Sequence, residues 1–373
     1  MTRHQLTGSR LPRRPGSASG FHYLVHDEFT NAVAAGSVNG TAAVPGPGTR
    51  GVTDTESNIS ITGGLLVYAG GKSSPSSAGD PEFYYGSLAR AAGRAFITRW
   101  RTSSDQAHSY PGGWFSATGG NAGRSGLWYM NSNLCCLVIS TVITIFNATT
   151  DTWYPLAVVA RASGYHFLYQ SGSDWILAWV DDSETPDPIY PYTYTYDEPQ
   201  DYSHIRVADL GAPWSTAYGI ATDHLAGSRQ AEDTFSHEAD CLIELTVDTL
   251  PGAATPIRFR FRKQDSNNYW YFWANDFGEI KIYETVSGNP TQRAGAQAGS
   301  ITAGDRVLIH CNDTSITVYI ENSLELSYAS ASNFKTCTAG ELYTLGTAVV
   351  SNIVAWPRVL SGSALSALER YTA

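Results

Sequence analysis

The sequence predicts an all-β protein made of two sandwich domains, and three observations lead to that prediction. Apolar and polar residues alternate along most of the chain, as they do in strands that bury one face. Short turn sequences such as Asn312-Asp313 separate these segments at close intervals. The composition of 16% charged residues, 35 Gly and 22 Tyr suits short strands and tight turns better than helical bundles. A length of 373 residues exceeds one ordinary sandwich, so two are expected.

The C-terminal half shows the clearest alternation. Ile257, Phe259 and Phe261 alternate with a stripe of three arginines, Arg258, Arg260 and Arg262. The stripe suits a solvated sheet face, or a face that meets an acidic neighbour. The same period predicts further strands over residues 241–248, 267–274, 279–286, 305–312, 315–320 and 323–328.

The N-terminal half repeats this plan with longer loops rich in Gly, Ser and Pro. Strands are expected over residues 64–68, 95–101, 126–130, 133–146, 153–162, 165–170 and 174–180. In each half a meander of strands leads to a closing strand and an exit that contains Trp and Pro, which indicates an internal repeat. The expected division is an arm over residues 1–20, a first sandwich over 21–225 and a second over 226–373.

Four stretches resemble the concanavalin A-like lectin/glucanase superfamily, in particular its laminin-G-like jelly rolls. They are Asp27-Glu28-Phe29-Thr30, the segment from Asp265 to Trp270, the segment from Ile316 to Asn322, and the tail from Trp356 onward. The resemblance implies two tandem jelly-roll sandwiches with a short C-terminal helix. Each motif is short and indicates a fold rather than an activity.

The resemblance also implies a cofactor and a biological context. Jelly rolls of this superfamily often hold a structural Ca²⁺ where the first and last strands meet, which points to Asp27 and Asp201. No other cofactor is expected. Paired jelly rolls with such loops are similar to bacteriophage tail-fibre, adhesin and decoration proteins, so the expected location is a virion surface or another extracellular surface.

Two aromatic runs are the candidate binding surfaces. Alternation places Tyr269, Tyr271 and Trp273 on one face of a strand and Trp270 with Phe272 on the other. Because a sandwich strand has one core-facing side, one set is expected to meet a sugar, a partner or solvent. The second run alternates tyrosine with threonine and contains Tyr192, Tyr194 and Tyr196. Packing between subunits, contact with a glycan and ordinary structural packing all remain open for these residues.

Charge separates the N-terminal arm from the rest of the chain. The protein carries a net charge of −10, which argues against nucleic acid or an anionic membrane as a partner. The arm is basic, and it is expected either to be a disordered terminus or to dock on a neighbouring subunit. Its cations are Arg3, Arg10, Arg13 and Arg14.

Catalysis is not expected from this sequence. Glycoside hydrolysis needs a pair of carboxylates that flank the scissile bond, and the superfamily's hydrolases carry them on one strand as Glu-x-Asp-x-Glu. That pattern does not occur, and neither does a Gly-x-Ser-x-Gly motif. We therefore expect a non-enzymatic structural protein of a phage virion that forms homo-oligomers and contacts other virion proteins. The alternative is an adhesin that binds host surface glycans.

Overall fold

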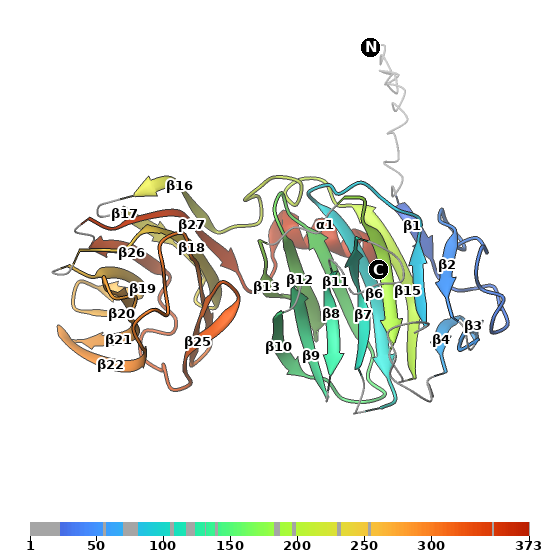
Figure 1. Ribbon diagram of the computed structural model, residues 1–373, viewed down its shortest axis with the longest axis horizontal. Helices are drawn as coiled ribbons and strands as arrows, with labels where there is room; N and C mark the ends of the chain where they lie inside the picture. The colour runs from blue at the N-terminus through green and yellow to red at the C-terminus, as the bar shows by residue number, and fades with distance from the viewer. Residues whose placement is uncertain are drawn as a thin grey trace, which may run out of the picture.

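The computed structural model describes residues 23–54, 57–69, 81–104, 108–116, 124–130, 132–138, 141–182, 187–195, 199–229, 233–252, 255–344 and 347–372. These residues form two antiparallel β-sandwiches side by side and a C-terminal helix, α1 (Gly362–Thr372) (Figure 1). The all-β jelly-roll fold class predicted from the sequence is confirmed.

The first sandwich contains an eight-stranded and a seven-stranded sheet. The eight-stranded sheet has the order β13-β12-β11-β6-β15-β4-β3, and β1 also pairs with β15. Its strands are β1 (Tyr23–Asp27), β3 (Ile59–Thr62), β4 (Leu65–Tyr68), β6 (Arg94–Thr102), β11 (Tyr154–Ala160), β12 (Tyr165–Ser171), β13 (Asp174–Val180) and β15 (Gln200–Asp209). The facing sheet has the order β10-β9-β8-β7-β14-β5-β2. Its strands are β2 (Arg50–Thr53), β5 (Glu82–Tyr85), β7 (His108–Phe115), β8 (Arg124–Met130), β9 (Asn133–Val138), β10 (Thr141–Asn147) and β14 (Tyr190–Thr195).

The second sandwich pairs two six-stranded sheets. One has the order β16-β27-β18-β23-β24-β25. Its strands are β16 (Asp223–Arg229), β18 (Cys241–Thr249), β23 (Arg306–Asn312), β24 (Ser315–Ile320), β25 (Ser323–Tyr328) and β27 (Val349–Pro357). The other has the order β17-β26-β19-β20-β21-β22. Its strands are β17 (Asp233–Ser236), β19 (Ile257–Asp265), β20 (Asn268–Ala274), β21 (Ile280–Val286), β22 (Asn289–Ala296) and β26 (Ala339–Thr344).

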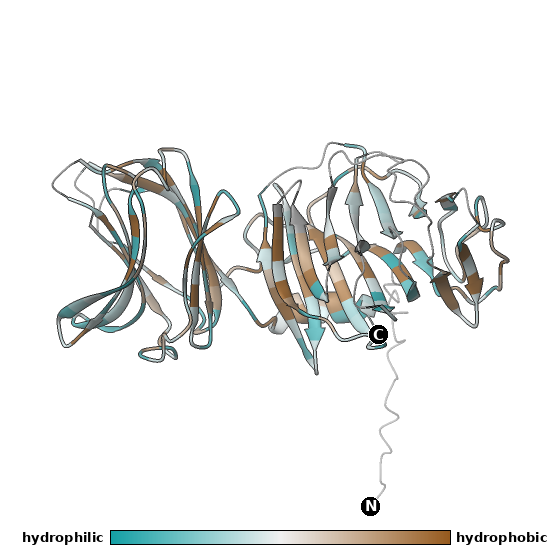
Figure 2. Cartoon of the chain, turned by 60° about the horizontal axis from the view of Figure 1, so that its bottom comes forward, coloured by the Kyte–Doolittle hydropathy of each residue, from teal (hydrophilic) through white to brown (hydrophobic). Residues whose placement is uncertain are grey.

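The core of the second sandwich lies where the alternation places it. Ile243 and Leu245 of β18 face Phe259 of β19 and Phe272 of β20 across the sandwich, and all four belong to one buried cluster. The polar residues between them point outward, so hydrophobic and hydrophilic positions alternate along these strands (Figure 2). One face of each sheet is thus left for other contacts.

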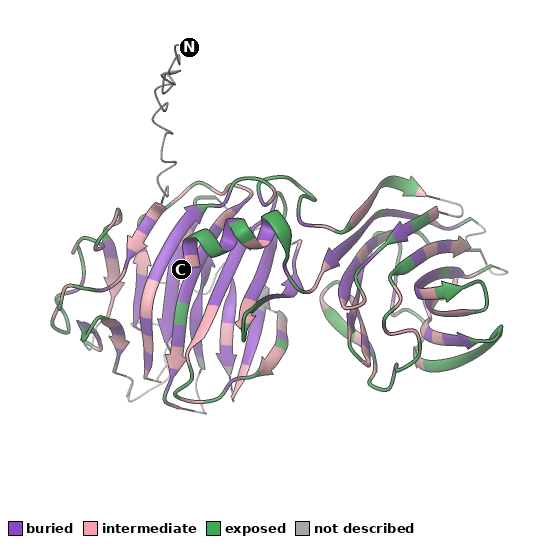
Figure 3. Cartoon of the chain, turned by 180° about the vertical axis from the view of Figure 1, so that it is seen from behind, coloured by how far each residue is buried: buried purple, intermediate pink, exposed green. Residues whose placement is uncertain are grey.

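The eight-stranded sheet of the first sandwich is buried on both faces. Along β11 the consecutive residues Leu156 to Ala160 are fully buried, and β13 shows the same pattern from Trp175 onward. Helix α1 lies across the outer face of this sandwich (Figure 3). Its Leu368 and Tyr371 join the buried cluster of the first sandwich, and the Arg206 guanidinium donates to the Tyr371 carbonyl at 2.8 Å. The terminal helix, expected in the second domain, therefore packs on the first.

The chain that leaves β27 ties the two sandwiches together. The Leu177 amide of edge strand β13 donates to the Arg358 carbonyl at 2.7 Å, and the Leu360 amide donates to the Trp175 carbonyl at 2.9 Å. A charged cluster lies beside this pairing, where Glu244 of β18 is 3.4 Å from Arg306 and 3.6 Å from Arg161. The two sandwiches therefore share backbone hydrogen bonds and ion pairs.

Candidate functional site

Strand β20 separates two sets of aromatic side chains. Trp270 and Phe272 are fully buried between the sheets, and the Trp270 indole N–H donates to the Asn333 carbonyl at 2.8 Å. Tyr269 and Trp273 are half-buried on the opposite face. Trp270, which the sequence analysis placed among the ligand contacts, is thus a core residue whose indole nitrogen is already bonded.

Five rings make up what we call the outer aromatic face. These are Tyr269, Tyr271 and Trp273 of β20, Tyr283 of β21 and Tyr343 of β26. Tyr271 is directly opposite Tyr283 in the sheet, and the two rings stack at 4.9 Å between centroids with planes 5° apart. Tyr283 and Tyr343 were not among the predicted contact residues. Both can be found by extending the period-two alternation that places Ile282 and Leu342 in the core.

Arg260 of β19 occupies the middle of this face. Its guanidinium carbon lies 3.4 Å from the Tyr343 ring centroid and 4.2 Å from that of Tyr269. It also donates to Glu341 at 2.8 Å and to the Tyr269 hydroxyl at 3.2 Å. Three residues hold one guanidinium through four contacts, so the donors of Arg260 and the acceptor oxygens of Glu341 are fixed in position.

The arginine stripe expected on this face is interrupted. Arg258 is exposed and Arg260 lies among the rings, but the Arg262 side chain is completely buried and donates to the Ala239 carbonyl. The pairing of β19 with β20 shifts between Phe261 and Asp265, and Arg262 has a φ of 46°. A bulge of this kind turns the following side chain away from the expected face.

Trp273 has a cation on each side in the sheet. Arg258 of β19 and Lys281 of β21 are its direct cross-strand neighbours. The Lys281 ammonium lies 4.3 Å from the Trp273 ring centroid and 3.3 Å from Glu279. Among the described residues, the Arg258 side chain has no hydrogen bond or ion pair.

Electrostatics distinguish this face from the acidic protein around it. The Lys263 ammonium forms a second ion pair with the Glu341 carboxylate, at 2.8 Å, beside that of Arg260. Although burial opposes the shift, these two cations lower the pKa of Glu341, so it is ionised at neutral pH. Burial raises the pKa of Tyr271 to about 12, so its hydroxyl keeps its proton. The face thus offers neutral hydroxyls, cationic donors and one carboxylate acceptor.

The tyrosines of β14 lie in a different environment. Tyr192 and Tyr194 are 2% and 6% exposed, and they pack with Tyr110 and Phe115 on the outer face of the seven-stranded sheet. Phe115 and Tyr192 stack at 4.4 Å with nearly parallel planes. Thr193, which lies between Tyr192 and Tyr194, points inward and forms a hydrogen bond with the Tyr68 hydroxyl at 2.7 Å, so β14 is buried on both faces. Tyr196 lies outside the described residues.

Asp27 and Asp201 do not come together as a calcium site. The Arg50 guanidinium binds both carboxylate oxygens of Asp27 at 2.6 Å, and the Tyr85 hydroxyl donates to the same carboxylate at 2.9 Å. Asp201 pairs instead with Arg101 at 2.7 Å. Each carboxylate pairs with an arginine, and calcium binding by this protein stays a prediction. No group of three or more His, Cys, Asp or Glu within the described ranges could hold a metal ion.

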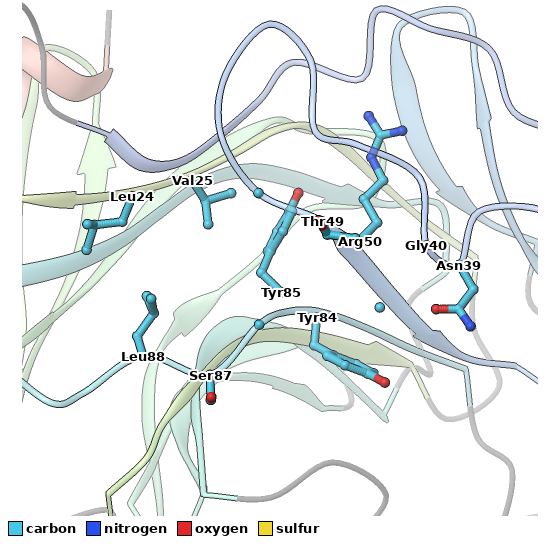
Figure 4. Close-up of a pocket in the computed structure, with 13 residues that line it drawn as sticks. Leu24, Val25, Asn39, Gly40, Thr49, Arg50, Tyr84, Tyr85, Ser87 and Leu88 are labelled. Atoms are coloured by element: carbon cyan, nitrogen blue, oxygen red, sulfur yellow. The ribbon is translucent and has the colours of Figure 1, made fainter.

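A cavity of about 450 Å³ opens beside this ion pair, lined by residues of β1, β2 and β5 and of the loops that flank them (Figure 4). Tyr84, Tyr85 and Leu88 line one side, and the Arg50 guanidinium points away from the Tyr84 ring. The donors of Arg50 are used by Asp27, Asn31 and Thr41. The cavity therefore presents mainly apolar and backbone surface.

The remaining sequence predictions fall partly beyond what the structure describes. Arg3, Arg10, Arg13 and Arg14 lie outside the described residues, so the role of the arm stays a prediction. In the part of the chain that is described, no helix has the length and hydrophobicity that crossing a bilayer requires.

Comparison with known proteins gives a partial likeness to solved structures. No protein-family model matches the chain, and no curated protein matches it. Sheep galectin-11 matches 34% of this chain and 95% of its own, with 9% identity and a TM-score of 0.27. The carbohydrate-binding module CBM66 of Bacillus subtilis matches 38% of this chain and 91% of its own, with 13% identity and a TM-score of 0.27. A β-1,3-glucanase of Mycobacterium marinum matches 50% and 99%, with 15% identity and a TM-score of 0.32. These identities and TM-scores are too low to transfer a ligand from any of these proteins to this chain.

Proposed function

We propose that this protein binds carbohydrate on the outer aromatic face of its second sandwich. The observation that carries the proposal is the set of five rings on a sheet face that has no core to fill. The opposite face already supplies Trp270, Phe272 and Phe259 to the interior. Tyr and Trp combine an apolar ring with a polar group, which suits a surface that meets the apolar faces and hydroxyls of a sugar.

The polar groups between the rings suit the same ligand. Arg260 and Glu341 supply fixed donors and acceptors, as sugar hydroxyls require. Because Tyr269 and Tyr343 already sandwich the guanidinium, little side-chain freedom is lost when a ligand binds. Trp273 has a different role, because displacing the Lys281 ammonium from its ring costs little at a half-exposed site.

The other expectations from the sequence stay predictions. Membership of a phage virion, homo-oligomer formation and the absence of catalysis are compatible with a glycan-binding face. None of them is needed for the proposal.

A glycan array with the full-length protein tests the proposal. We expect saturable binding, weakened about tenfold or more by Trp273→Ala, because a stacking ring contributes on the order of 1 kcal/mol beyond its buried area. Tyr218→Ala is the matched control, since Tyr218 is 36% exposed but lies outside this sheet and stacks on His224. Equal binding by wild type and Trp273→Ala, or no glycan binding at all, contradicts the proposal.

A further inference from the structure

Three side chains form a row across adjacent strands of the outer aromatic face. Arg258, Trp273 and Lys281 are consecutive cross-strand neighbours on β19, β20 and β21. Neighbouring strands lie about 4.8 Å apart, so one sugar ring stacked on the indole also reaches the residues on both sides. The row therefore combines a stacking platform with two flanking cations.

The two cations differ in how they are held. Lys281 is half-buried, contacts the Trp273 ring and bonds to Glu279 at 3.3 Å. Arg258 is exposed, and within the described parts of the chain no carboxylate pairs with it. An unpaired guanidinium beside a ring presents its planar set of donors to whatever covers the indole.

Charge is unevenly distributed in this protein. The chain has a net charge of −10 and 24 Lys and Arg residues in total. Four of those cations, Arg258, Arg260, Lys263 and Lys281, lie on or beside the outer aromatic face, against the carboxylates of Glu279, Glu341 and Asp265. Cations therefore outnumber these carboxylates on and beside the outer aromatic face.

We propose that the Arg258–Trp273–Lys281 row binds an acidic sugar, with the ring on the indole and a carboxylate or sulfate group on the flanking cations. This inference rests on the proposed carbohydrate-binding function and names the ligand class of that face. Guanidinium binds carboxylate or sulfate through two parallel hydrogen bonds, and such bonds are stronger than those to neutral hydroxyls. A neutral sugar can stack on the Trp273 indole but cannot form ion pairs with Arg258 and Lys281.

The test is an array that holds each glycan in an acidic and a matched neutral form. Uronic acids are paired with their methyl esters, and sulfated sugars with their desulfated counterparts. We expect the acidic member of at least one pair to bind about tenfold or more tightly, and Arg258→Ala to remove most of that difference. Raising the salt concentration should weaken the acidic member more than the neutral one, because exposed charges are screened.

Lys335→Ala is the matched control, because it removes one positive charge from an exposed residue that pairs with Asp313 instead of lying on this face. It should leave the preference unchanged. Equal binding of acidic and neutral members overturns the acidic-sugar inference and leaves carbohydrate binding in place. A preference that Lys335→Ala reduces as much as Arg258→Ala also overturns it. No binding to any glycan overturns the proposed function itself.

Discussion

Trp270 and Trp273 lie three residues apart on β20, and their surroundings give them opposite roles. Trp270 is fully buried and bonds to Asn333, whereas Trp273 is half-buried beside Lys281. Trp270→Ala should lower the free energy of unfolding by about 3–5 kcal/mol, the usual cost of a large core truncation. Trp273→Ala should change it by less than about 1 kcal/mol and act on glycan binding instead. Urea denaturation of the two variants measures this difference, and similar losses of stability in both would contradict these assignments.

His166 lies between the two sandwiches with no hydrogen-bond partner on either ring nitrogen among the described residues. Its ring packs edge-on against Trp214 and Trp356, with distances between ring centroids of 5.6 and 5.1 Å. Burial, assisted by the Arg161 charge, holds the pKa of His166 well below 6.5. Below pH 6.5 the histidine therefore binds a proton in the unfolded chain but stays neutral in the folded protein. As the pH decreases, the free energy of unfolding decreases until the pH reaches the pKa of the folded state.

His166→Phe should remove this part of the acid sensitivity. One such histidine contributes a slope of up to about 1.4 kcal/mol per pH unit in this window. Denaturation midpoints measured from pH 7 to pH 4 should therefore fall less steeply in the variant. An unchanged slope would show that His166 protonates in the folded protein.

At the residue scale, the sequence was sufficient wherever period-two alternation decides the outcome. It placed Tyr269, Tyr271 and Trp273 together on one face, as observed. It could not identify which face met the partner sheet, so Trp270 was grouped with the ligand contacts. The Asp27–Arg50 pair joins residues 23 positions apart, and the Tyr192 environment needs Thr193 to bond to Tyr68 across 125 positions. Contacts at such separations leave no local pattern.

At the scale of elements, the C-terminal helix shows why strand β11 lacks alternation, whereas β13 packs against the segment after β27 and against Tyr319 of β24. Helix α1 was expected from the family resemblance, but its docking partner was not. The signal in the sequence was the uninterrupted run of apolar residues from Leu156 to Ala160, because a strand of a two-layer sandwich normally exposes every second residue. A third layer over the eight-stranded sheet accounts for that run.

Leu368→Ala tests this docking. Leu368 is fully buried in the cluster of the first sandwich, so its truncation should cost about 2–5 kcal/mol. Hydrogen exchange should show the loss of protection in β6, on which the helix packs. Ser366→Ala, on the exposed side of the same helix, should stay within about 0.5 kcal/mol of wild type. Loss confined to the second sandwich would contradict the observed packing.

At the scale of the whole molecule, a charged cluster joins the sandwiches. Glu244 lies between Arg306 and Arg161 and accepts from the Trp356 indole at 3.1 Å. Burial alone would raise its pKa, but the two guanidinium groups lower the pKa of Glu244 to about 2. A depressed carboxyl pKa stabilises the folded protein above the unfolded value of 4.5, and this contribution disappears as the pH falls toward 2.

Glu244→Gln should therefore be costly, because it removes the carboxylate between two buried guanidinium groups and leaves Arg306 with Asp182 as its ion-pair partner. We expect a loss of about 3–5 kcal/mol at pH 7, with the two sandwiches unfolding in separate calorimetric transitions. Glu369→Gln removes an equal charge from an exposed position on α1 and should behave like wild type. A single transition at the wild-type temperature for Glu244→Gln would show that the cluster does not couple the sandwiches.

The most direct test of the central claim locates the bound sugar on the molecule. Hydrogen exchange of the full-length protein is measured with and without the tightest-binding glycan from the array. If the outer aromatic face binds carbohydrate, protection should increase in β19, β20, β21 and β26 and stay unchanged in the first sandwich. Protection confined to the tyrosine cluster of β7 and β14, or to the cavity beside β2 and β5, would contradict the account.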